Sequence, residues 1–422
     1  MLFAQIFTFG KVFLGYNARN LNIPWLDETN ALLLKSNQYD MTTPNKRLES
    51  LDVLRGFDLF CLTILCPFLH AFFRTGEYQW LQPVIKQFDH IAWTGFAFWD
   101  LVMPLFMFMA GVSIPFALDK YLKSGESRLK IYRRIGKRVV ILWILGMICQ
   151  GNLLALDIDS LKIYCNTLQA IAVGYLFSAL LFLHTSVRIQ IAASASLLVI
   201  YWGALTFVAA DGYGQGDFTA SGNLAEWIDR TVLGKWRDGA IREANGTIVF
   251  PVWYNYTWIW SSLNFIVTVM TGVFAGQLLK SHLPEKKKWT YLFAIGIGMA
   301  IAGWLWHLQL PVIKRIWTSS MVLVSSGYCF LLMGAFYYLI DYKGLRRGWT
   351  WLKVIGTNSI LAYMLSVEVG VIRLDCIGHS LFFGFKQYLS PEQYQLLILM
   401  SNLGLVYCLL YILYKHRIFI KA

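Results

Sequence analysis

The chain has 422 residues, of which 57% are hydrophobic and only 14% are charged. Soluble globular proteins carry about 25% charged residues, so this composition excludes an ordinary water-exposed surface. The net charge of +13 does not indicate a nucleic-acid-binding protein, because most of the basic residues lie in short connections between apolar runs. Basic residues in such connections orient membrane proteins and contact anionic lipids. We therefore predict an all-α, polytopic membrane protein.

The apolar runs have the length of membrane-spanning helices, which need about 20 residues each. Tryptophan and tyrosine gather at their ends, as they do at membrane–water interfaces. This pattern predicts a bundle of about ten (ten or eleven) transmembrane helices. The ten runs lie near residues 57–73, 96–118, 138–156, 165–183, 189–210, 257–280, 289–308, 317–341, 350–372 and 395–414.

Residues 1–45 precede the first run and form an N-terminal extension in this interpretation. The segment from Met1 to Tyr16 is apolar, but it contains Lys11 and lacks the basic start of a secretory signal peptide. A second methionine, Met41, stands just before a basic segment that is typical of a cytoplasmic start. We expect residues 1–40 to be either dispensable or a misassigned start.

The charges of the connections predict the orientation of the bundle. Connections 119–137, 281–288 and 342–348 and the C-terminal tail are strongly basic, whereas the connections that alternate with them carry few basic residues. Basic connections favour the cytoplasm, so we expect both termini there. Because the chain has no large extracytoplasmic domain and no clear signal peptide, a bacterial inner membrane is the expected location. The segment around His90 and the connection 211–256 then face the extracytoplasmic side.

His90 stands where a short connection meets the apolar run Leu101 to Leu118, and Asp100 follows it ten residues later. Titratable groups at a membrane boundary usually face a protein interior or a wet cavity. Imidazole is suited to proton or acyl transfer near neutral pH, so His90 is a catalytic candidate. Asp100 either orients the imidazole or only caps the helix start. The alternative for His90 is an interfacial histidine that is hydrogen-bonded to a loop carbonyl.

Several blocks carry a resemblance to a known family. They are Asp52…Arg55-Gly56, His90…Trp93…Gly95…Asp100-Leu101…Pro104, Leu168-Gln169, Trp227-Ile228-Asp229-Arg230…Leu233-Gly234 and Asn358-Ser359-Ile360-Leu361. Through these blocks, and over nearly everything from Arg47 to Lys421, the sequence resembles the transmembrane acyltransferases typified by heparan-α-glucosaminide N-acetyltransferase and its bacterial relatives. The resemblance implies that residues 46–422 form a transmembrane acyltransferase domain, with His90 and Asp100 as its catalytic residues.

The resemblance also implies acetyl-CoA as co-substrate. The phosphates of CoA need cationic partners, which the basic connection offers, although membrane topology alone explains such a connection. Polar groups inside apolar helices are candidates for contacting the thioester carbonyl or its oxyanion, and interhelical packing is the alternative. The candidates for binding acetyl-CoA are Gln169, Asn358, Ser359, Lys314, Trp317, Arg133, Arg134 and Arg138.

The connection 211–256 is rich in glycine, aspartate and tryptophan. Connections of this length are usually functional or disordered. Aromatic and acidic side chains together suit a sugar, so Trp227 and Asp229, together with Trp93 of the His90 block, are candidates for binding the substrate. A packing cap over the bundle explains the composition of the connection equally well.

The predicted function is transfer of an acetyl group from cytosolic acetyl-CoA to an extracytoplasmic amino sugar or glycan. A neutral His90 acts as general base or as transient acyl carrier. The alternatives are O-acetylation of an envelope polysaccharide, a proton-coupled transporter for a small sugar or amino sugar, and a non-catalytic partner in glycan export. Expected partners are acetyl-CoA, the glycan, membrane lipids and, as an open option, a second copy in a homodimer. Neither a metal nor nucleic acid is expected.

Overall fold

The computed structural model describes residues 48–76, 78–125, 127–243, 245–250, 256–366 and 374–419. The extension predicted for residues 1–45 lies outside these described residues. Within them the secondary structure is almost entirely helical, and the strands are two hairpins of two-residue strands. The all-α prediction is confirmed. The hairpins pair β1 (Ala209–Ala210) with β2 (Tyr213–Gly214) and β3 (Ile241–Arg242) with β4 (Ile248–Val249).

Eight helices of the described chain are long and apolar enough to cross a membrane, which confirms the polytopic class but not the count of ten. The first span combines α3 (Glu49–Phe60), a π-helical segment and α4 (Cys66–Phe73). The next seven include α6 (Val102–Lys123), α8 (Thr167–His184), α9 (Val187–Phe207), α11 (Ser262–Lys280), α12 (Glu285–Trp306), α13 (Ser319–Phe336) and α17 (Pro391–Lys415).

The basic connection predicted at 119–137 is mostly helical, which corrects the sequence interpretation. Helix α6 continues to Lys123, and α7 (Arg128–Gln150) begins ten residues before the predicted position 138. Lysine and arginine are good helix formers, so the backbone does not have to break where the apolar run ends. The turn between the two helices contains Gly125, whose φ of 68° lies in the left-handed region.

The run predicted at 350–372 is not one continuous helix. It forms α14 (Thr350–Thr357) and α15 (Ser359–Met364), with a non-helical Asn358 (φ −118°, ψ 48°) between them. Residues 367–373 lie outside the described chain. A short helix α16 (Asp375–Leu381) then leads toward α17.

Small residues bring the helix backbones into close contact. A Cβ atom on Gly111 of α6 would lie 2.0 Å from the Val269 carbonyl oxygen, and one on Gly272 of α11 would lie 2.0 Å from the Phe108 carbonyl oxygen. The same kind of contact joins α3 to α14, where a Cβ atom on Gly56 would lie 1.9 Å from the Leu352 carbonyl oxygen. Lipid supplies no hydrophobic force between helices, so such close packing stabilises the bundle.

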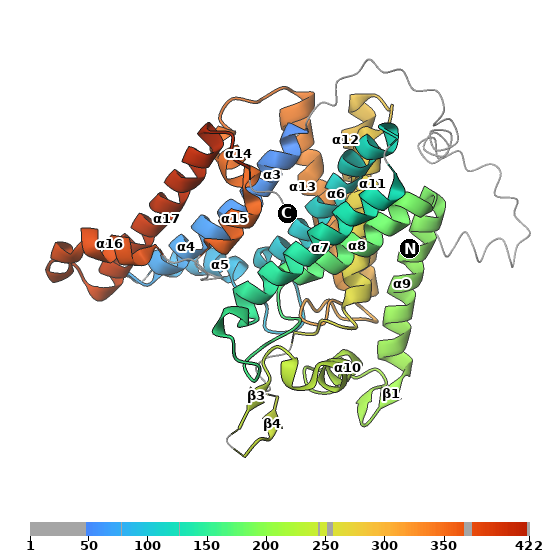
Figure 1. Ribbon diagram of the computed structural model, residues 1–422, viewed down its shortest axis with the longest axis horizontal. Helices are drawn as coiled ribbons and strands as arrows, with labels where there is room; N and C mark the ends of the chain where they lie inside the picture. The colour runs from blue at the N-terminus through green and yellow to red at the C-terminus, as the bar shows by residue number, and fades with distance from the viewer. Residues whose placement is uncertain are drawn as a thin grey trace, which may run out of the picture.

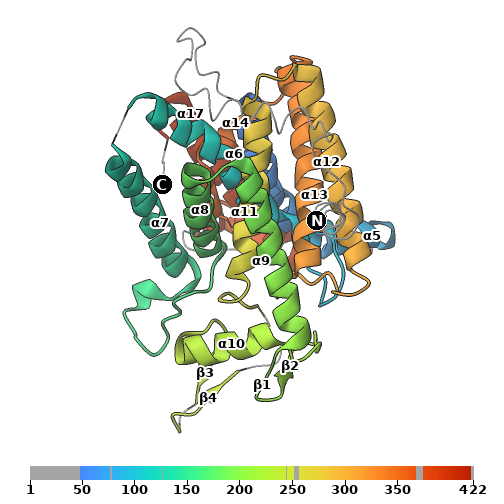
Figure 2. The ribbon, with the colours of Figure 1, turned by 90° about the vertical axis from the view of Figure 1, so that its right-hand side faces the viewer.

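The connection 211–256 forms a small folded layer rather than an irregular loop. Figures 1 and 2 show α10 (Leu224–Leu233) and the two hairpins across one end of the bundle, beyond the end of α9. Glu226 on α10 pairs with the fully buried Arg237 at 2.5 Å and with Arg230 at 2.7 Å. We call this end of the bundle the capped end.

The α6–α11 crossing generates a prediction. Replacing Gly272 with leucine places side-chain atoms where the Phe108 backbone lies, so we expect a destabilisation of about 1–3 kcal/mol, as for other overpacked cores. Gly298→Leu on α12 is the matched control, because nothing lies within 4 Å of a Cβ built there. Thermal unfolding in detergent measures both variants. Equal midpoints for the two would contradict the tight crossing.

Candidate active site

His90, Asp100 and Lys314 meet at the capped end of the bundle. Nδ1 of His90 lies 2.8 Å from Oδ1 of Asp100, and Nζ of Lys314 lies 3.4 Å from the same carboxylate oxygen. Nζ is also 3.2 Å from Nδ1 of His90. The lysine comes from the connection between α12 and α13, 224 residues along the chain from His90. One carboxylate oxygen therefore has both a histidine and a lysine beside it.

Asp100 both orients the imidazole and caps the helix start, so the two roles considered from the sequence are combined. Its Oδ2 accepts a hydrogen bond of 3.1 Å from the Ala97 amide at the start of the 3₁₀ helix Phe98–Leu101. Asp100 is 1% exposed, whereas the His90 side chain is 40% exposed. The carboxylate of Asp100 is therefore much more buried than the imidazole of His90.

The backbone joins the two segments that carry these side chains. The amide of Gly95 donates to the Val312 carbonyl oxygen at 2.9 Å, and Thr94 forms an antiparallel bridge with Ile313. Gly95 has a φ of 129°, a conformation that a residue with a Cβ atom rarely adopts. These contacts hold the histidine segment next to the lysine.

The surroundings keep the imidazole uncharged near neutral pH. Burial lowers the pKa of His90, and the nearby ammonium of Lys314 lowers it further, against the opposing effect of Asp100. Burial also lowers the pKa of Lys314, to about 8, while Asp100 acts in the opposite direction. If Nδ1–H donates to Asp100, the lone pair of the neutral ring is on Nε2. A base or nucleophile needs that form.

His90 and Lys314 line a cavity of about 260 Å³ inside the bundle. Its walls come from the first spanning helix, the start of α6, the end of α7, the start of α8 and the segment before α11. The cavity is mainly apolar and aromatic, with a few polar groups. The other lining residues are Leu62, Trp99, Val102, Met103, Phe106, Gln150, Cys165, Thr167, Tyr256, Trp258 and Tyr363.

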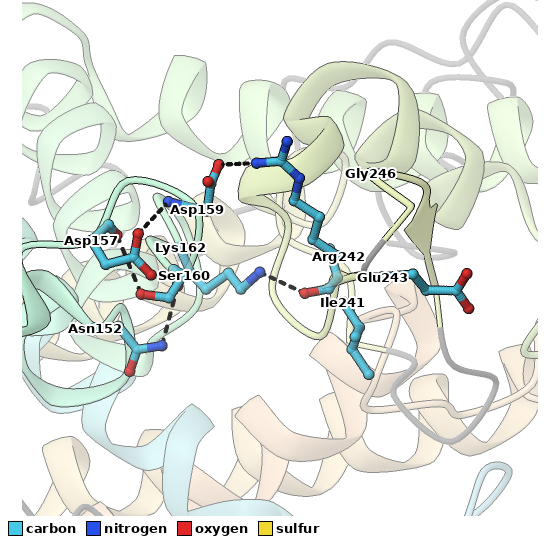
Figure 3. Close-up of a pocket in the computed structure, with 10 residues that line it drawn as sticks. Asn152, Asp157, Asp159, Ser160, Lys162, Ile241, Arg242, Glu243 and Gly246 are labelled. Atoms are coloured by element: carbon cyan, nitrogen blue, oxygen red, sulfur yellow. Dashed lines mark hydrogen bonds and ion pairs between the residues drawn. The ribbon is translucent and has the colours of Figure 1, made fainter.

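A second, more open cavity of about 730 Å³ lies at the capped end, where the connection after α7 meets β3 (Figure 3). Its charged groups are paired with other side chains or with the backbone. Arg242 contacts Asp159 at 2.6 Å, and Nζ of Lys162 donates to the Ala240 carbonyl oxygen at 2.6 Å (Figure 3). The lining residues contain no histidine or cysteine, so the cavity beside His90 is the better candidate for chemistry.

The predicted substrate-binding residues anchor the cap. Nε1 of Trp93 donates to the Phe218 carbonyl oxygen at 2.8 Å, and Nε1 of Trp227 donates to Asp211 at 3.0 Å. Asp229 accepts hydrogen bonds from the amides of Trp258 and Ile259 at 2.7 and 2.9 Å. Burial raises the pKa of Asp229 to about 7. None of the three predicted residues lines the His90 cavity, so their placement matches the packing-cap alternative.

Most of the predicted acetyl-CoA contacts lie elsewhere in the bundle. The Gln169 amide is engaged at the start of α8, where Oε1 accepts from the Cys165 amide at 2.8 Å and Nε2 donates to the Ile163 carbonyl oxygen at 2.5 Å. Asn358 donates to the Ile418 carbonyl oxygen at 3.1 Å, and the half-buried Ser359 follows it.

Trp317 is also engaged internally, because its Nε1 donates to Thr268 at 3.0 Å. Gln169, Asn358, Ser359 and Trp317 are absent from the cavity lining. Of the eight predicted contacts, Lys314 is the one that lines it, and it does so as the partner of Asp100.

The predicted arginines lie on the first half of α7. Arg133 is exposed, the Arg134 guanidinium lies 3.9 Å from the centre of the Tyr121 ring, and that of Arg138 lies 4.3 Å from the Tyr175 ring. Gln150, the last residue of α7, lines the His90 cavity. Twelve residues of helix separate it from Arg138, which corresponds to about 18 Å. The arginines therefore lie on the first half of α7, and the cavity lies at its last residue.

The aromatic lining residues Tyr256, Trp258 and Tyr363 were not identified from the sequence. Tyr256 and Trp258 lie at the start of a predicted span, where aromatic residues are expected at the lipid interface, and Tyr363 lies inside the run predicted at 350–372. Nothing in the pattern distinguishes a ring that faces lipid from one that faces a cavity.

The chain is similar to two curated proteins, whereas no family model matches it. It is 28% identical to heparan-alpha-glucosaminide N-acetyltransferase of Homo sapiens over 89% of its length, and 27% identical to that of Mus musculus over 90%. The chain spans about 60% of the length of these relatives, 60% for the human protein and 62% for the mouse protein. The resemblance inferred from the sequence is thereby confirmed.

Proposed function

We propose that this chain, a member of the heparan-α-glucosaminide N-acetyltransferase-like family, is a membrane acetyltransferase that moves an acetyl group from acetyl-CoA to a sugar or glycan. The observation that carries the proposal is the imidazole of His90, held by Asp100 and Lys314 at the wall of a cavity inside the helix bundle. The names of the two relatives denote N-acetyl transfer to a glucosaminide.

The geometry supports two routes for the transfer. In the first, the acceptor attacks the thioester carbonyl carbon, Nε2 of His90 takes the proton from the acceptor, and the departing CoA thiolate receives it. In the second, Nε2 attacks the carbonyl carbon and CoA leaves as its thiolate, which gives a positively charged acetyl-imidazole; the acceptor then attacks the acetyl carbon, the C–N bond to His90 breaks to return the neutral ring, and the proton of the acceptor passes to the CoA thiolate. Asp100, 2.8 Å from Nδ1, stabilises the positive ring that forms in either route.

Lys314 keeps the resting ring uncharged. Its ammonium opposes protonation of His90, so that the lone pair is available near pH 7. By sharing the buried carboxylate at 3.4 Å, it also reduces the cost of leaving Asp100 away from water.

The basic first half of α7 supports a donor site at the other end of the bundle. The phosphates of CoA need cationic partners, and Arg138 carries a buried Nε–H without a hydrogen-bond partner within the described ranges. In this proposal, the basic end and both termini face the cytoplasm of a bacterial inner membrane. Residues 46–422 act as one transmembrane domain, and the capped end receives the acceptor.

The cavity lining also favours a second candidate, O-acetylation. The lining residues include Lys314 and His90 but no carboxylate. The neighbouring Asp100 carboxylate is already paired with His90 and Lys314, so a positively charged ammonium meets no carboxylate in the lining, and we infer that the attacking group enters uncharged. A hydroxyl group meets this condition directly, whereas an amine has to lose its proton first.

Purified protein in detergent, incubated with radiolabelled acetyl-CoA and a panel of amino sugars, neutral sugars and envelope glycans, tests the proposed function. We expect labelled product, and a fall in kcat/KM of about 100- to 10,000-fold in His90→Ala, which loses its base or nucleophile. His70→Ala is the matched control, because His70 also lies 2.8 Å from a carboxylate, that of Asp89, but does not line the cavity. A transporter would yield no product in detergent, where no gradient exists.

The pH dependence of kcat/KM gives a further prediction. Activity should rise with pH as His90 loses its proton. Removing the Lys314 cation in Lys314→Met raises the pKa of His90, so the acidic limb of the profile should move to higher pH. Asp100→Asn removes the anion that stabilises the protonated ring and should move the limb to lower pH. Shifts of the two variants in the same direction would contradict these assignments.

A further inference from the structure

Trp258 lines the His90 cavity and carries a buried hydrogen-bond donor. The residue lies in the segment just before α11 and is 5% exposed. It lines the cavity together with His90 and Lys314, and its buried Nε1–H has no hydrogen-bond partner among the described residues. Leaving a buried donor unsatisfied is costly, so its presence in a residue that lines this cavity calls for an explanation.

The backbone and the neighbouring rings fix the position of this indole. The Trp258 amide donates to Asp229 of the cap at 2.7 Å, and its carbonyl oxygen accepts from the Ser262 hydroxyl at 2.8 Å. The Tyr164 ring centre lies 5.3 Å from the indole, and the Tyr256 ring, which also lines the cavity, is stacked on it at 6.4 Å and 27°. These contacts therefore hold Trp258 in a defined position in the cavity wall.

We propose that Trp258 is a specificity-determining residue for a sugar acceptor, whose oxygen accepts a hydrogen bond from the indole Nε1–H. Tyr256 and Trp258 together form the apolar wall against which the C–H face of the sugar ring lies. This inference rests on the proposed acetyl transfer and assigns the indole to the binding of the acceptor.

The chemistry of the indole selects the ligand group. An indole N–H donates and cannot accept, so it recognises an oxygen atom and neither an ammonium nor a hydrocarbon. The volume of about 260 Å³ lies below the roughly 300–1,000 Å³ of typical small-molecule sites. The cavity therefore suits one small ring rather than an oligosaccharide. The backbone amide of Trp258 donates to Asp229 of the cap, and in the proposed function the cap lies on the acceptor side.

Trp258→Phe removes the N–H and keeps an aromatic ring. The matched control is Trp260→Phe, because Nε1 of Trp260 is also buried without a partner in the described chain, but its ring packs near Tyr201 in a separate cluster outside the cavity. Acetyl transfer to glucosamine is measured with purified protein, together with thermal unfolding. We expect KM for glucosamine to rise about threefold to tenfold in Trp258→Phe, while kcat and KM for acetyl-CoA stay within twofold of the Trp260→Phe values.

An unchanged KM for glucosamine, or an equal rise for acetyl-CoA or in Trp260→Phe, overturns the inference. If Trp258→Phe does not fold, the unaltered protein supplies the test through competition by cyclohexylamine and by 4-aminocyclohexanol, two ring amines that are both protonated near pH 7 and differ by one hydroxyl group. Cyclohexylamine should compete with glucosamine at least threefold more weakly than 4-aminocyclohexanol does, and equal competition overturns the inference. If the unaltered protein acetylates no sugar of the panel, the proposed function itself fails, whatever the state of Trp258.

Discussion

The site depends on one buried carboxylate. Asp100 is removed from water at the start of a membrane span, where an unpaired charge is costly. The imidazole of His90 and the ammonium of Lys314 share its Oδ1, and the Ala97 amide bonds to Oδ2. The requirement to satisfy this one group draws together two segments that are 224 residues apart. This arrangement also leaves Nε2, on the other edge of the imidazole, available to groups that enter the cavity.

The helix packing fixes how two helices next to the site lie against each other. Asp100 stands just before α6, and Trp258 lies just before α11. The two helices cross in backbone contact at Gly111 and Gly272, so neither can slide along the other without a clash. The cap closes the same end through Asp229, which holds the Trp258 and Ile259 amides.

Much of the fold and the centre of the site could be predicted from the sequence. Composition and apolar run length predicted the helical membrane class. His90 and Asp100 lie close in the chain, so their pairing could be inferred. The contact of Lys314 with Asp100 could not be inferred, because it depends on how α12 and α13 pack relative to α6.

The other differences also have physical causes. The start of α7 was misplaced because basic residues end an apolar run without ending a helix. The sequence could not decide the role of Trp227, because an aromatic residue in a long connection suits a ligand and an anchor equally well. Its Asp211 partner is known only from the folded chain. Trp258 was not identified as a site residue, because its position near a span end resembles that of an ordinary interfacial tryptophan.

The central claim is that Asp100 holds His90 as a neutral ring with the lone pair on Nε2. Nitrogen-15 NMR of histidine-labelled protein in lipid, with the His90 signals identified by their loss in His90→Ala, tests it most directly. The account predicts one protonated nitrogen, Nδ1, and one bare nitrogen, Nε2, at pH 7, with this preference lost in Asp100→Asn. A His90 ring that is protonated on both nitrogens at pH 7, or that carries its single proton on Nε2, would contradict it.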